Sequence, residues 1–148
     1  MKSLSFAGIF VFMLLTIGAT LAPSAFCAGP NWVELDDNME STFFYDKNGT
    51  TKPQEGMVRV VTRVVYSEEG KAEALKVLSK YKGMDKLYES RYVHDLVCGE
   101  RESRLLSAAH LAEDGTPLRS TDLSSVTELE AIPPETRMWY VLQEACGQ

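Results

Sequence analysis

The ten residues from Met57 to Tyr66, MVRVVTRVVY, constrain the fold of this chain more than any other segment. Such a dense run of β-branched residues disfavours a helix and is typical of a strand. Alternation puts Arg59 and Arg63 on one face of that strand, and valines with Thr62 on the other. We therefore predict a long strand with one buried face and one partly solvated face.

Other segments with strand character lie on both sides of it. Turn signals at Asn48-Gly49 and Asp114-Gly115 join neighbouring strands by short connections, which favours antiparallel pairing. The segment 50–56 carries Pro53 and Gly56 and is expected to be a loop. The further strands are expected at residues 31–36, 41–46, 87–98, 104–112 and 116–120.

Two segments have helical spacing of their apolar residues. In residues 67–83, Ala74, Leu75 and Leu78 recur at three- and four-residue intervals, with Ser67 as N-cap and Gly83 as the expected stop. The second helix is expected at residues 136–146. The sequence thus predicts an α+β fold: an antiparallel sheet of about six strands with one inserted helix and a C-terminal helix packed on it.

The N-terminus has the order of a signal peptide. Lys2 precedes an apolar run at residues 6–17, and small residues follow Pro23. We place the cleavage between Cys27 and Ala28, which gives a signal peptide at 1–27 and a domain at 28–148 with no membrane span after cleavage. A retained membrane anchor and lipidation of Cys27 are the alternatives, and the bulky Phe26 disfavours lipidation.

Cleavage leaves two cysteines, Cys98 and Cys146. An even count in an exported chain predicts a disulfide, with two unpaired buried thiols as the alternative. Closing a loop of this length in the unfolded chain corresponds to about 4 kcal/mol of stability.

The charge balance excludes some partners. The chain carries a net charge of −6 at pH 7, and removal of Lys2 with the signal peptide makes it −7. This acidity argues against nucleic acid and against anionic membrane surfaces as partners.

Catalytic and metal-binding motifs are not evident in the sequence. His94 and His110 lack a second ligand at metal-binding spacing, and no phosphate-binding loop or nucleophile elbow is present. Cys98 and His94 would lie about 13 Å apart along one strand, too far for base activation. We therefore expect no cofactor, no metal and no enzymatic activity.

The aromatic residues are the most plausible candidates for recognition. Phe43 and Tyr45 lie in one strand, and Trp139 and Tyr140 in the C-terminal helix. These four residues can form an interaction surface or belong to the core.

The mature chain resembles the bacterial surface-adhesin protein E family from Trp32 to Cys146. The resemblance rests on the order of several short segments: Trp32-Val33, Phe44-Tyr45-Asp46, residues 58–66, Cys98 with Arg101, residues 105–112 with Asp114-Gly115, Ile132-Pro133-Pro134, and Cys146. It implies a small exported domain, periplasmic or at the cell surface, with a disulfide and an adhesin-like role.

Three functions remain open at this point. The favoured one is a non-enzymatic binding domain that recognises a protein partner, or a second copy of itself, at the bacterial envelope. The second is a structural subunit of an envelope assembly. The third is a periplasmic enzyme or small-ligand carrier with a cleft between sheet and helices, for which His94, His110 and Arg104 are the candidate residues.

Overall fold

A computed structural model describes residues 29–147, so the predicted signal peptide and its cleavage site at Cys27 and Ala28 lie outside the described residues. Of the helices within that range, none is long and apolar enough to cross a membrane. The strands are β1 (Trp32–Asp37), β2 (Ser41–Asp46), β3 (Thr51–Gln54), β4 (Met57–Tyr66), β5 (Glu89–Val97), β6 (Glu102–Leu111), β7 (Pro117–Asp122) and β8 (Glu130–Ala131). The helices are α1 (Glu68–Leu78), the short 3-10 helix η1 (Met84–Lys86) and α2 (Arg137–Cys146).

All strand pairs are antiparallel. Six strands follow one another across the sheet in the order β1-β2-β4-β5-β6-β7, while β3 pairs with β4 and β8 with β6. The long strand β4 pairs with β5 over almost its whole length, from Met57 opposite Val97 to Val65 opposite Glu89. The predicted α+β fold with an antiparallel sheet and two helices is therefore confirmed.

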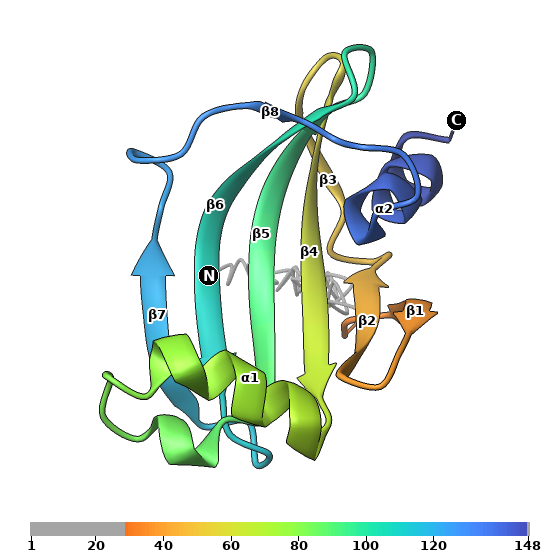
Figure 1. Ribbon diagram of the computed structural model, residues 1–148. Helices are drawn as coiled ribbons and strands as arrows, with labels where there is room; N and C mark the ends of the chain where they lie inside the picture. Colours follow the sequence, from red (N-terminus) through yellow and green to blue (C-terminus); the bar gives the residue numbers. More distant parts are fainter. Residues whose placement is uncertain (1–28, 148) are drawn as a thin grey trace, which may run out of the picture.

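The two faces of the sheet differ in chemistry. One face, which we call the helix face, carries Val58, Val60 and Leu96 and lies against α2 (Figure 1). The opposite face, which we call the arginine face, carries Arg59, Arg63, Arg91 and Arg104, because cross-strand partners point to the same side. The core on the helix face comprises Phe43, Tyr45, Val58, Val60, Leu96, Ile132, Val141 and Leu142.

Helix α2 is attached to the sheet at both of its ends. At its C-terminal end, Cys146 forms a disulfide with Cys98, with 5.8 Å between the two Cα atoms, which confirms the predicted pair. At its start, the Arg137 guanidinium donates to Asp36 Oδ2 at 2.7 Å and to Ser41 Oγ at 2.9 Å. The disulfide therefore ties one end of α2 to the residue that follows β5, and the Arg137 contacts tie the other end to β1 and β2.

Helix α1 lies across one end of the sheet, at the bottom of Figure 1. Its predicted N-cap is confirmed, since Ser67 Oγ accepts a hydrogen bond from the Gly70 amide at 3.1 Å. Gly70 is the buried residue of the helix and lies directly against the backbone of Glu40. This contact joins α1 to the β1–β2 turn.

Two predictions about element bounds were wrong. Residues 50–56 are not a loop throughout, because Thr51–Gln54 forms β3 and Gly56, with φ of +74°, makes the turn into β4. Helix α1 ends at Leu78 rather than near Gly83, and Gly83, with φ of +83°, instead begins η1. The backbone of Gly83 has the left-handed conformation expected of a helix-ending glycine, but the residue caps the start of η1 instead of the end of α1.

Candidate functional site

The first pair of candidate surface aromatics lies in the core. Phe43 and Tyr45 are only 4% and 3% exposed, because β2 turns them toward α2. Arg137 lies over the Phe43 ring, with 5.3 Å between the guanidinium carbon and the ring centroid. Of the two roles expected for Phe43 and Tyr45, interaction surface or core, the structure places both side chains in the core, since alternation along β2 points both inward.

The second pair lies in α2, and its two side chains differ in exposure. Tyr140 is 40% exposed, and Trp139 is half-buried, with part of its ring against the core. The Arg101 guanidinium lies over the Trp139 ring at 5.4 Å from the centroid. Trp139, Tyr140 and Arg101 together form what we call the α2 patch.

Backbone geometry fixes the arginine of the α2 patch. Arg101 has a left-handed conformation, φ of +58°, which is unusual for a residue with a side chain. Its amide donates to Val97 O at 2.9 Å, and its carbonyl accepts from the Ile132 amide at 2.8 Å. The β5–β6 turn and the segment before α2 thus hold Arg101 against Trp139.

The residues suggested for a catalytic or ligand cleft are not brought together. His94 and His110 share the helix face but lie four residues apart in register, His94 opposite Leu105 and His110 opposite Ser90. That separation is about 13 Å along the strands. Arg104 lies on the arginine face, opposite Asp95, so the sheet itself separates it from both histidines.

His110 belongs to a buried hydrogen-bonded chain. Its Nδ1 lies 2.7 Å from Ser90 Oγ, which also accepts a hydrogen bond from the Tyr66 hydroxyl at 3.0 Å. Burial, and next the nearby Arg119, lower the pKa of His110. Ser90 is completely buried, and among residues 29–147 no carboxylate hydrogen-bonds to the imidazole, so this serine–histidine pair as described lacks the access and geometry of a nucleophile and its base.

His94 lies at a small cavity of about 240 Å³. Glu128 and Glu130 line the same cavity, and burial lowers the pKa of His94 to about 4. Within residues 29–147, no three side chains of the metal-binding types are placed to hold an ion. His94 is therefore a neutral imidazole at ordinary pH.

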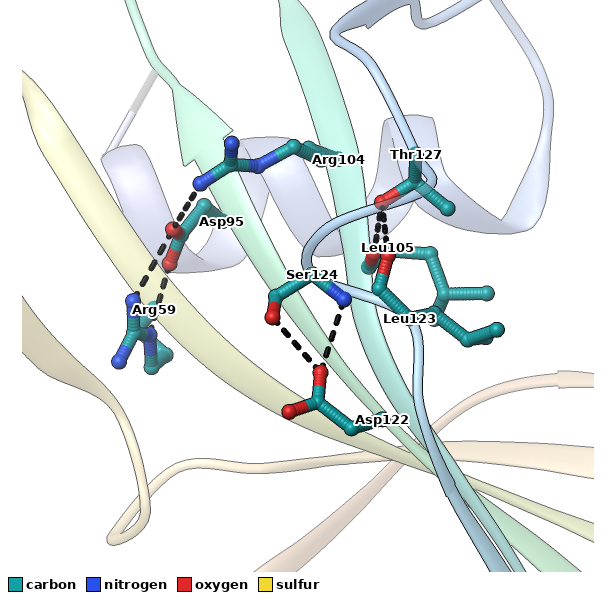
Figure 2. Close-up of polar contacts among 8 residues, drawn as sticks. All are labelled: Arg59, Asp95, Arg104, Leu105, Asp122, Leu123, Ser124 and Thr127. Atoms are coloured by element: carbon teal, nitrogen blue, oxygen red, sulfur yellow. Dashed lines mark hydrogen bonds and ion pairs between the residues drawn. The ribbon is translucent and has the colours of Figure 1, made fainter.

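The arginine face contains charged clusters that sequence reasoning missed. Asp95 is only 1% exposed and lies between two guanidiniums (Figure 2). Arg59 binds it through two hydrogen bonds, at 2.8 and 3.0 Å, and Arg104 lies 3.6 Å away. The sequence contains these arginines and this aspartate. It does not show that they lie opposite one another, because that depends on the register of the strands.

A second cluster of the same kind surrounds Glu89. This carboxylate is 3% exposed and forms ion pairs with Arg63 and Arg91. Both guanidiniums also lie over the Trp32 ring, at 5.6 Å each from its centroid. Two arginines thus satisfy each buried acid, which is the arrangement that makes a buried carboxylate tolerable.

Comparison with known proteins identifies the fold. No family model matches the sequence, and no curated protein sequence matches it. One structure of Haemophilus influenzae protein E superposes with a TM-score of 0.56 at 15% identity, over 78% of this chain and 83% of that one. The selenomethionine form of the same protein gives a TM-score of 0.57 at 12% identity, over 81% and 93% of the two chains. The chain therefore has the fold of Haemophilus influenzae protein E, as the resemblance in sequence predicted.

Proposed function

We propose that this protein is an exported, non-enzymatic binding domain that recognises a protein partner at the bacterial envelope. The observation that carries the proposal is the α2 patch, where Arg101 lies over Trp139 and the next residue of the covalently fixed helix, Tyr140, is exposed. Tyrosine, tryptophan and arginine are the residue types most enriched among energetically dominant interface residues. The likeness in fold to protein E, of the surface-adhesin family, supports the same role.

Rigidity favours recognition through this patch. The disulfide, the Arg137 contacts and the backbone hydrogen bonds of Arg101 hold the patch in place before any partner arrives. A surface that is already ordered loses less conformational entropy on binding. Tyr140 can therefore contribute its ring and hydroxyl to an interface at low entropic cost.

The proposed binding role requires that the protein is exported. We infer cleavage between Cys27 and Ala28 and a location in the periplasm or at the cell surface. Intact mass spectrometry of protein from the native envelope tests this, before and after reduction and alkylation. A chain beginning at Ala28 with two thiols that appear only on reduction supports it. A chain beginning at an acylated Cys27 would replace it with a lipoprotein.

Photo-crosslinking in the producing bacterium tests the binding role. A photoreactive phenylalanine analogue is placed at position 140, and in a matched control at position 77, because Val77 is exposed on α1 far from the patch in sequence. We expect a discrete protein adduct from position 140 and none of the same mass from position 77. An adduct twice the mass of the chain would identify a second copy as the partner. Absence of any specific adduct at position 140 would contradict the proposal.

A further inference from the structure

A hollow of about 690 Å³ lies at the α1 end of the sheet, away from the α2 patch. We call it the end hollow. Residues from β4, α1, η1 and the β6–β7 turn line it, so four separate parts of the chain converge there. Its volume is within the range of about 300–1,000 Å³ that is usual for small-molecule sites.

The floor of the end hollow is apolar and aromatic. Leu87 is 1% exposed and Ala112 is 9% exposed, and the half-buried side chains of Tyr66 and Tyr88 adjoin them. The Tyr66 hydroxyl is engaged with Ser90, whereas the Tyr88 hydroxyl has no partner within residues 29–147. Such a floor offers van der Waals contact to an apolar side chain and one free hydroxyl to a polar group.

The rim of the end hollow carries charges of both signs. Lys71 and Lys86 provide two ammonium groups, and Glu68 and Glu113 provide two carboxylates. Among the described residues, none of these four side chains forms an ion pair or hydrogen bond. The fifth charged residue, Asp114, accepts a hydrogen bond from the Thr116 amide at 2.9 Å and also interacts electrostatically with Lys86.

The balance of charge selects the ligand. An anion would meet the carboxylates of Glu68, Glu113 and Asp114, and a cation would meet the two lysines, so a ligand of one sign gains attraction and repulsion together. A ligand with one carboxylate and one ammonium can satisfy both kinds of group. Its apolar part would then cover Leu87 and the tyrosine rings.

We propose that the end hollow binds a zwitterionic ligand of the amino-acid or short-peptide type that carries an apolar side chain. The carboxylate of the ligand faces Lys71 and Lys86, and its ammonium group faces Glu68 and Glu113. This site is independent of the α2 patch and of the protein partner proposed there.

Titration of the purified protein with defined probes, followed by amide NMR, tests the site. The probes are L-phenylalanine, the dipeptide phenylalanyl-alanine, and N-acetyl-phenylalanine amide, which lacks both charges. We expect saturable shifts of the amides at Lys71, Leu87 and Glu113 with at least one charged probe, and binding of the uncharged probe that is weaker by about tenfold or more. Tighter binding of L-phenylalanine would indicate a free amino acid as the natural ligand, and tighter binding of the dipeptide would indicate a peptide.

Lysine variants provide the matched control. The double variant K71A/K86A is expected to weaken binding about five- to tenfold, because each exposed charge pair contributes up to about 1 kcal/mol. K76A, on the same helix but paired with Glu73 outside the hollow, should bind as the unmodified protein does. Shifts that do not saturate with any probe, equal binding of the uncharged probe, or equal loss in K76A would each overturn the proposal.

Discussion

At the scale of single residues, two buried carboxylates of the sheet, Asp95 and Glu89, have partners that compensate for the loss of water. Asp95 is held by Arg59 and Arg104 from the two neighbouring strands, and Glu89 by Arg63 from β4 and by Arg91 from its own strand. His94 is different, because no described group holds a charge on it, so the imidazole remains neutral when folded. The paired carboxylates and the neutral histidine should therefore respond differently to mutation and to pH.

His94 should make folding stability depend on pH between about 6.5 and 4. Its pKa is lowered by burial to about 4, so below pH 6.5 the unfolded chain binds a proton that the folded chain does not. Its contribution is therefore complete above pH 6.5 and is lost as pH falls toward 4, by up to about 3 kcal/mol. Urea unfolding of the unmodified protein and of H94Q at both pH values isolates this difference. Identical loss of stability in the two proteins would contradict it.

Glu89 should be far more sensitive to neutralisation than an exposed acid in a similar pair. E89Q leaves Arg63 and Arg91 without their carboxylate, and we expect the free energy of unfolding to fall by about 3 kcal/mol. E73Q is the matched control, because Glu73 pairs with Lys76 on the exposed surface and should cost no more than about 0.5 kcal/mol. If denaturant unfolding gives the same loss of stability for E89Q and E73Q, the buried cluster stabilises the fold no more than the exposed ion pair does.

At the scale of elements, α1 is anchored through a glycine rather than through a broad apolar face. A Cβ atom at Gly70 would lie 1.9 Å from the carbonyl oxygen of Glu40, which is backbone and cannot move aside on its own. The helix therefore approaches the β1–β2 turn at a distance that only glycine allows.

Replacing Gly70 by alanine should destabilise the protein although alanine is the better helix former. On an exposed helix the change would add about 1 kcal/mol of stability, and here the clash should reverse the sign and cost at least about 1–3 kcal/mol. G99A is the control, because nothing lies within 4 Å of a Cβ there and its φ is not left-handed. If thermal unfolding shows that G70A is as stable as the parent, the backbone at Glu40 can move away without cost and the prediction is wrong.

The sequence predicts long, strongly patterned elements well, and short or edge elements poorly. Strand β4 and helix α2 were placed correctly because valine density and apolar spacing are local signals. Strand β3 was missed because its four residues are exposed and contain Pro53, so its pairing with β4 leaves no apolar pattern. The two-residue strand β8 is likewise too short to carry one.

The candidate site was predictable in part for the same reason. The aromatic content of β2 and α2 was visible in the sequence, but which side chains face the core depends on the pairing partner of each strand. Phe43 and Tyr45 therefore looked equivalent to Trp139 and Tyr140, and only the docking of α2 separates them. The end hollow depends on four segments meeting, and no local pattern marks it.

At the scale of the whole molecule, the disulfide joins the last helix to the end of the central strand β5, where Cys98 follows Val97. Cys98 and Cys146 close a loop of 48 positions, so loss of the bond should cost about 4 kcal/mol through the entropy of the unfolded chain. C98S and C146S should lose the same amount, because each removes the same bond. Calorimetric unfolding that gives clearly unequal losses would contradict this assignment of the stability to the cross-link.

The affinity of the α2 patch for the protein captured at position 140 tests the central claim most directly. With purified components, isothermal titration calorimetry of Y140A should show a loss of about 30-fold or more, which corresponds to about 2 kcal/mol at a dominant interface residue. V77A, an exposed apolar residue on α1, should bind like the parent. Equal affinity of Y140A and V77A for that partner would contradict recognition through the α2 patch.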